Sequence, residues 1–183
     1  MSTTRERVLD AAIHLAGSQG IRALTHARVD AAADLPKGST SNYFRTRNAL
    51  LAGVIERIAV SERADLASAV GSPVTSVDEF VDAFTGVVTA LTGPYADRTR
   101  ARYALFLELS SDSELQAPLR AQRAAFAELS RSILADLGAK HPDAAVQAFM
   151  AFGDGLILHR LTVDPDAPVR PSVAIAIRGC LEA

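Results

Sequence analysis

Residues 24–50 decide the fold that the sequence predicts, and they read LTHARVDAAADLPKGSTSNYFRTRNAL. Thr25 can cap a short helix, which must end near Leu35 because Pro36 disfavours helical geometry in the residue before it. Pro36 can then lie in the first turn of a second short helix that runs to Tyr43, where its missing N–H costs nothing. The stretch therefore predicts two short helices joined by a tight turn.

Helical signals continue on both sides of this stretch. Thr3 and Glu6 form a capping box for a helix over residues 4–19, and Gly20 supplies its left-handed stop. Thr46 can cap a long helix, and Ser76 opens another one after a boundary at Gly71-Ser72-Pro73. Further helices are expected over residues 96–110, 114–137, 142–162 and 172–181, with Pro118 in the first turn of its helix and with Gly153 and Gly155 in close contact with another helix. The sequence thus predicts an all-α protein.

The composition is that of a globular chain with a real hydrophobic core, since 49% of its 183 residues are hydrophobic. A single cysteine, Cys180, excludes a disulfide framework, and the histidines show no paired ligand spacing, so we expect no metal site and no cofactor. The first residues lack the pattern of a signal peptide, and no apolar run reaches the roughly 18 residues of a membrane helix. We therefore expect a soluble, cytoplasmic protein with no membrane partner.

Charge is divided unevenly along the chain. The net charge of the whole is −2, but residues 1–47 carry seven Lys and Arg against four Asp and Glu. The remainder is acidic. Because attraction to DNA needs positive charge near the phosphates and not over the whole protein, the N-terminal segment is the candidate for nucleic-acid binding.

The second short helix has the side chains that such binding needs. Lysine, serine, threonine, asparagine and tyrosine occupy nearly every outward position from Lys37 to Tyr43, and Gly38 allows close backbone approach. Hydroxyl groups and backbone N–H groups near a helix N-terminus bind phosphates, and Asn42 is suited to bidentate pairing with adenine. The chemistry alone leaves open a second interpretation, in which this is a surface helix whose Ser and Thr residues merely cap it.

The same stretch resembles the DNA-binding signature of the TetR family of bacterial transcription regulators. The matching landmarks are Thr25, Val29, Ala33, Lys37-Gly38, Tyr43-Phe44, Arg47 in place of the usual Lys, and Leu50. The sequence departs from the signature at four positions. Asp30 stands where the family usually has Ala, Asp34 where it has Gly, Pro36 where it has Ser or Thr, and Ser41 where it has Tyr. At Asp30 we expect either a small rotation of the helix face or a carboxylate that points to solvent.

The resemblance implies a helix-turn-helix DNA-binding domain of three helices over residues 1–48, and a helical regulatory and dimerisation domain over residues 49–183. Phe44 should lie in the core. Thr25, Lys37, Tyr43 and Arg47 are expected at phosphates, Arg28 near the DNA, and Ser39, Thr40, Ser41 and Asn42 nearest the base edges, with Gly38 between them. It also implies a homodimer through the last two helices, bound to double-stranded palindromic operator DNA as a repressor and released by a small apolar or amphipathic effector.

The aromatic residues of the C-terminal part are candidates for the effector pocket. The residues expected at a ligand are Phe84, Tyr103, Phe106, Phe126, Phe149, Phe152 and Asp154. The alternative for each aromatic residue is a place in the hydrophobic core.

Two other function classes compete with a regulator. A small all-helical enzyme would use Tyr103, Asp154 or His159 as acid or base, but no nucleophile motif, phosphate loop or metal pair accompanies them, so we assign no catalytic residue. A helical interaction module would explain the apolar helices and leave the polar, basic second short helix unexplained.

Overall fold

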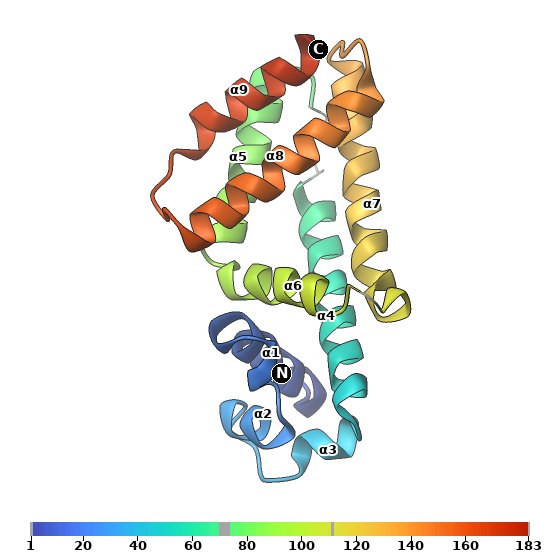
Figure 1. Ribbon diagram of the computed structural model, residues 1–183, viewed down its shortest axis with the longest axis vertical. Helices are drawn as coiled ribbons and strands as arrows, with labels where there is room; N and C mark the ends of the chain where they lie inside the picture. The colour runs from blue at the N-terminus through green and yellow to red at the C-terminus, as the bar shows by residue number, and fades with distance from the viewer. Residues whose placement is uncertain (1, 70–73, 111, 183) are drawn as a thin grey trace. The chain divides into compact units, whose positions relative to one another are not determined.

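The computed structural model describes residues 2–69, 74–110 and 112–182, and within these ranges every regular element is a helix (Figure 1). The elements are α1 (Thr4–Gln19), the 3₁₀-helix η1 (Ile21–Ala23), α2 (His26–Ala32), α3 (Ser39–Tyr43), α4 (Arg47–Ala69), α5 (Val77–Thr92), α6 (Ala96–Glu108), α7 (Ser113–Asp136), α8 (Pro142–Thr162) and α9 (Val169–Glu182). The all-α prediction is confirmed. The boundary expected at Gly71-Ser72-Pro73 lies outside the described residues.

The chain divides into two compact units. The head unit comprises Met1–Ala64 and Asp97–Gln122, and the body unit comprises Asp65–Ala96 and Arg123–Ala183. Helices α4 and α7 each begin in the head unit and end in the body unit. A domain boundary at residue 48 stays a prediction.

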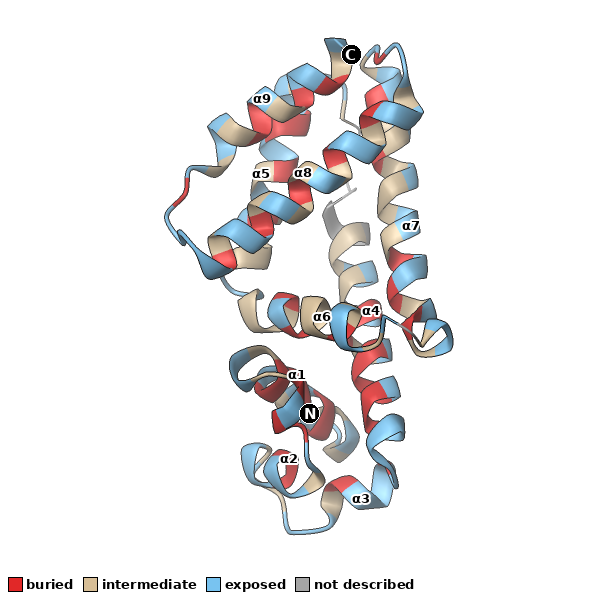
Figure 2. Cartoon of the chain, viewed as in Figure 1, coloured by how far each residue is buried: buried red, intermediate tan, exposed pale blue. Residues whose placement is uncertain are grey.

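The head unit is built on the apolar face of α1. Val8, Leu9 and Ala12 are almost completely buried there, and in Figure 2 the buried residues gather on α1 and on the first half of α4. Phe44 joins this core as predicted, with 5% of its surface exposed. Gly53 lets α4 come close to that ring, because a Cβ at this position would lie 2.5 Å from Cε1 of Phe44. The head unit thus fixes the start of α4 against α1.

Local caps set most helix starts as the sequence predicts. The Thr3–Glu6 capping box of α1 is present, and Ser76 forms a second box with Glu79 at the start of α5. Thr25 accepts from the backbone N–H of Arg28, 3.4 Å away. Each cap satisfies amide groups that the first helical turn leaves without partners, which is why these starts can be predicted from neighbouring residues.

Two proline positions differ from expectation. Pro36 lies outside α3, which begins only at Ser39, because Asp34 (φ 52°) and Gly38 (φ 90°) turn the chain through left-handed conformations. Pro118 lies in the interior of α7 and not in its first turn, because that helix starts at Ser113.

The body unit is centred on aromatic rings from three helices. Phe84 of α5 lies 4.5 Å from Phe149 of α8 and 6.3 Å from Phe126 of α7, measured between ring centroids. Gly153 admits this packing, since a Cβ there would lie 3.0 Å from Cζ of Phe84, and its predicted close contact is confirmed. For Gly155 that expectation is wrong within the chain, because nothing lies within 4 Å of a Cβ built at this residue.

Candidate nucleic-acid interface

The turn between α2 and α3 is tied to the first helix of the head unit. Asp34 adopts a left-handed conformation, which is unusual for a residue with a Cβ. The Arg7 guanidinium donates to the carbonyl oxygens of Ala33 (2.7 Å) and Asp34 (3.1 Å). These bonds hold the end of α2 against α1, so that α3 leaves the turn in a defined direction.

Asp30 connects α2 with the start of α3. Its carboxylate accepts from the backbone N–H of Gly38 (2.8 Å), from the backbone N–H of Thr40 (2.7 Å) and from the Thr40 hydroxyl (2.6 Å). The residue is 3% exposed, so a carboxylate pointing to solvent is wrong. Burial acts to raise the pKa of Asp30, but the hydrogen bonds from Thr40 and Gly38 outweigh burial, and the pKa lies below its ordinary value of 3.8.

Thr40 differs most from the role that the sequence suggested. It is completely buried, and its hydroxyl bonds to Asp30. Ser39 is half-buried and donates its hydroxyl to the carbonyl of Pro36 (2.6 Å), whereas Ser41 and Asn42 are exposed. The outward surface of α3 is thus narrower than the sequence suggested, and Ser41 and Asn42 belong to it, whereas Thr40 does not.

The other end of α3 is held as well. His26 of α2 donates from Nε2 to the carbonyl oxygen of Phe44 (2.6 Å), the residue that follows α3. The Arg5 guanidinium lies 5.4 Å from the Phe44 ring centroid. Between these ends, Tyr43 keeps 48% of its surface exposed. A five-residue helix that could not be stable alone is therefore fixed by contacts at both termini.

The cationic residues of the head unit fall into engaged and free groups. Arg28 bonds to the side chain of Gln19, and Arg47 donates to the carbonyls of Leu24 (2.7 Å) and Ile21 (3.2 Å). Among the residues that the structure describes, the exposed Lys37 has no such partner.

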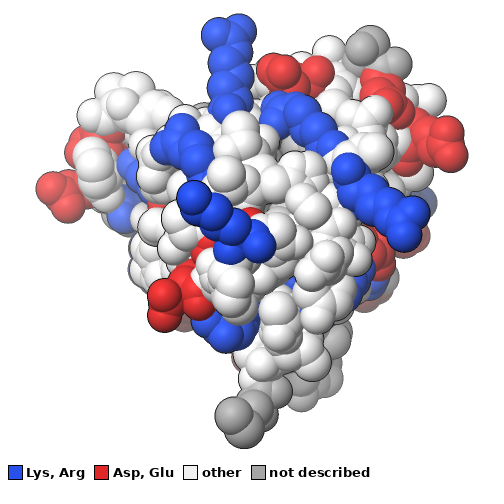
Figure 3. All heavy atoms as spheres, turned by 90° about the horizontal axis from the view of Figure 1, so that it is seen from below, with Lys and Arg blue, Asp and Glu red and all other residues white. Residues whose placement is uncertain are grey.

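Arg45, which sequence reasoning missed, is exposed two residues after α3. Its position in a basic stretch was the available signal. Figure 3, which looks at the end of the head unit that carries α3, shows Lys and Arg side chains projecting from this face, with carboxylates among and around them.

The residues expected at an effector are divided between the two units. Tyr103 and Phe106 belong to the head unit, where the Arg102 guanidinium lies 4.7 Å from the Tyr103 ring centroid and Phe106 packs against the head core. The body unit holds the other five. Of these, Phe84, Phe126 and Phe149 form one cluster, which the sequence could not distinguish from core, and Phe80 joins it 5.3 Å from Phe149.

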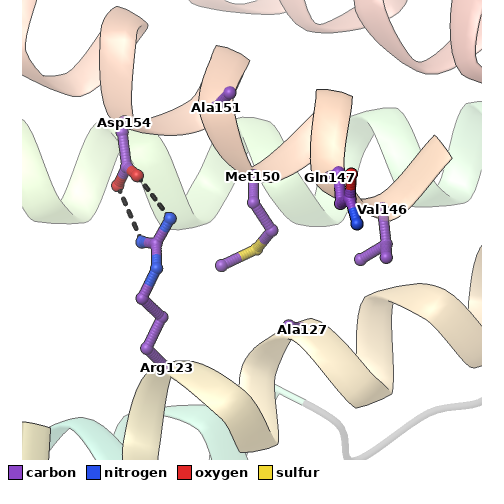
Figure 4. Close-up of a pocket in the computed structure, with 7 residues that line it drawn as sticks. All are labelled: Arg123, Ala127, Val146, Gln147, Met150, Ala151 and Asp154. Carbon is purple, nitrogen blue, oxygen red and sulfur yellow. Dashed lines mark hydrogen bonds and ion pairs between the residues drawn. The ribbon is translucent and has the colours of Figure 1, made fainter. Parts of the chain in front are cut away.

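Asp154 borders an open hollow of about 330 Å³ between α7 and α8 (Figure 4). The lining residues are Arg123, Ala127, Val146, Gln147, Met150, Ala151 and Asp154. Two hydrogen bonds, of 3.1 and 2.6 Å, join the Arg123 guanidinium to the Asp154 carboxylate. Sequence reasoning missed Arg123 because its partner lies 31 residues further along the chain. The hollow therefore combines an apolar wall with one ion pair.

The comparison with protein families gives a match over the body of the chain. The family model described as the tetracyclin repressor-like, C-terminal domain matches residues 75–183. The chain belongs to the TetR family. It is a transcriptional regulator and not an enzyme, because TetR proteins are regulators that act by binding and not by catalysis.

Several solved structures share the fold over nearly the whole chain. A TetR-family regulator from Streptomyces coelicolor is 21% identical with a TM-score of 0.81, and covers 98% of this chain and 94% of its own. A transcriptional regulator from a Rhodococcus species is 18% identical with a TM-score of 0.79, over 98% and 97% of the two chains. The multidrug-binding protein EbrR, solved with ethidium, is 26% identical with a TM-score of 0.63, over 96% of each chain. The comparison with curated proteins found no match.

Among the described residues, no helix combines the length and the apolar composition needed to cross a membrane.

Proposed function

We propose that this TetR protein is a cytoplasmic homodimeric repressor that binds a palindromic operator through α3 and leaves it when a small apolar or amphipathic effector binds the body unit. The observation that carries the proposal is the short α3 helix, fixed at both ends and exposing Ser41, Asn42 and Tyr43. A helix held in this way after a tight turn is suited to enter the DNA major groove.

The DNA contacts divide by chemistry. We assign phosphate contact to Thr25, Lys37 and Tyr43, and add the exposed Arg45 to them. The remaining DNA-binding residues of the proposal are Arg28, Gly38, Ser39, Ser41, Asn42 and Arg47, without Thr40, because its side chain is completely buried and bonds to Asp30. Among these, Asn42 is the candidate for base reading, because its exposed amide can pair with an adenine edge.

An exposed face of α8 and α9 supports the homodimer. Leu158 of α8 and Ile175 of α9 keep 39% and 76% of their surface exposed. Ala151, Gly155 and Gly179 are also exposed on these helices. Small residues beside apolar ones allow helices of two chains to approach closely, and a two-fold dimer would present two α3 helices to two half-sites.

The body unit offers two features to an effector. The hollow between α7 and α8 has an apolar wall and the Arg123–Asp154 ion pair, and the cluster of Phe84, Phe126 and Phe149 lies in the same unit. Phe152 is half-buried on α8 and belongs to the proposed ligand set, whereas Tyr103 and Phe106 lie in the head unit and are left out of it. That EbrR was solved with ethidium supports an aromatic or amphipathic effector class. Release requires that the effector bind the DNA-free conformation more tightly than the DNA-bound one.

The experiment is binding to a duplex that the full chain selects from a randomised library, followed by fluorescence anisotropy with that duplex and with random DNA. We expect a palindromic selected sequence and an affinity that falls steeply with salt. Lys37→Ala should weaken binding to both duplexes, while Asn42→Ala should weaken the selected one by about ten- to a hundredfold and leave random DNA nearly unchanged. Lys140→Ala, which removes an exposed lysine of the body unit outside α8 and α9, is the control and should change neither.

Two results would contradict the proposal. Equal losses on both duplexes for Asn42→Ala would remove the base-reading role. A protein that stays monomeric at micromolar concentration in sedimentation would exclude the dimer.

A further inference from the structure

The start of α3 has an unusual cap. The N-cap residue of this helix, Gly38, has no side chain to accept from the first turn. The acceptor comes instead from the preceding helix. The Asp30 carboxylate accepts hydrogen bonds of 2.6–2.8 Å from the backbone N–H groups of Gly38 and Thr40 and from the Thr40 hydroxyl. Three short bonds to an ionised group are stronger than bonds between neutral partners, so this cap is a firm link between the two helices.

The cap also removes the amides that a phosphate would use. The N–H groups of Gly38 and Thr40 point at Asp30, and the N–H of Ser39 donates to the carbonyl of Pro36, 3.1 Å away. A buried negative charge beside these amides disfavours a second anion at the same place. Contacts between this end of α3 and DNA therefore fall on exposed side chains and not on backbone amides.

We infer that Asp30 is a positioning residue for operator recognition, which sets the rotation of α3 so that Thr40 faces inward and Ser41 and Asn42 face the DNA. The inference rests on the proposed DNA binding by α3. It assigns Asp30 no contact with DNA: the residue is 3% exposed and its carboxylate is used by α3.

Asp30→Asn distinguishes this positioning role from a general electrostatic effect, because the two predict opposite changes in the affinity for the operator. Removing a negative charge near DNA should by itself tighten binding. Loss of the cap should instead weaken binding to the operator. The side-chain amide of Asp30→Asn has one oxygen where the carboxylate had two acceptors, and its NH₂ group faces the N–H donors of α3. We expect Asp30→Asn to bind the selected duplex about tenfold to a hundredfold more weakly, with random DNA unchanged or slightly tighter.

Asp34→Asn is the matched control. It removes the same charge from the same segment, but Asp34 is exposed, and asparagine tolerates its left-handed backbone. We expect equal or tighter binding to both duplexes. Thr40→Val and Thr40→Ser give a second pair. Only Thr40→Val removes the hydroxyl that donates to Asp30, so only Thr40→Val should weaken binding to the selected duplex. This pair tests the positioning role independently of the folding of Asp30→Asn.

Amide hydrogen exchange in the free protein completes the test. The N–H groups of Gly38 and Thr40 should be protected in the wild type and exchange faster in Asp30→Asn, with α1 amides unchanged. A wild-type chain that selects no sequence would overturn the proposed function. A wild-type chain that selects a sequence, with Asp30→Asn selecting it equally well or losing both duplexes by one factor, would overturn the positioning role alone.

Discussion

Gly155 allows the proposed dimer face to be tested with a single methyl group. The residue lies in the interior of α8, is exposed, and has nothing within 4 Å of a Cβ built on it. Within one chain, Gly155→Ala should therefore meet no obstacle and should gain about 1 kcal/mol of helix stability. Gly86→Ala in α5 is the matched control, since Gly86 is also exposed inside a helix with no atom within 4 Å of its Cβ.

The two variants should differ once a second chain covers α8. An added methyl group in a closely packed helix contact costs about 1–3 kcal/mol, and a two-fold interface contains the substitution twice. The dimer of Gly155→Ala should thus lose about 2–6 kcal/mol of association free energy, which corresponds to a dissociation constant raised at least tenfold. The gain in helix stability is present in the free chains as well and therefore cancels from the dissociation constant. Gly86→Ala should leave the dissociation constant unchanged.

Sedimentation velocity over a dilution series measures the dissociation constants, and urea unfolding of the dilute monomers measures the gain in each chain. We expect similar midpoint increases for both monomers and a weakened dimer only for Gly155→Ala. If Gly155→Ala associates as tightly as Gly86→Ala, α8 does not pack at Gly155 against a second copy.

Three further predictions concern single side chains. Phe149→Ala should lower the free energy of unfolding by about 3–5 kcal/mol, because removal of this fully buried ring leaves a cavity. In the same urea titrations Phe152→Ala should lower it less, because Phe152 is only half-buried. Because the pKa of Asp30 is lowered, its ionised carboxylate stabilises the fold above pH 3.8, the ordinary pKa, and this stabilisation is lost as pH falls through the lowered pKa. Acid titration of the head-unit fold should therefore show a loss of stability that is absent in Asp30→Asn. Arg47→Ala should destabilise the head unit by about 1–3 kcal/mol in urea titrations through two lost bonds to carbonyls, whereas Arg45→Ala should reduce the salt dependence of DNA binding by about one counterion.

The helix starts could be predicted because their causes are local. Thr3, Thr25 and Ser76 each cap with an amide three residues away, so the sequence contains both partners of the contact in one short window. The TetR landmarks carried the same local information for the head unit. These features were enough for the fold class and for the position of the helix-turn-helix.

The orientation of α3 could not be predicted, because its cause is a contact across a turn. Local rules place Pro36 in a helix, and only the bonds from Gly38 and Thr40 to Asp30 show that the helix starts later and faces differently. Patterns of polar residues also cannot tell an inward hydroxyl from an outward one when the helix has five residues. The Arg123–Asp154 ion pair could not be predicted for the same reason, since nothing in the sequence links partners that are 31 residues apart.

Arg47 has a mechanical consequence for the head unit. Its two bonds join the first turn of α4 to the backbone of η1 and Leu24, which are themselves continuous with α1 and α2. Because the guanidinium is planar and rigid, these bonds resist both sliding and rotation of α4 against that segment. A displacement that reaches the start of α4 is thus passed to η1 and α2 together, so α3, which lies between α2 and α4 in the chain, moves with both of them.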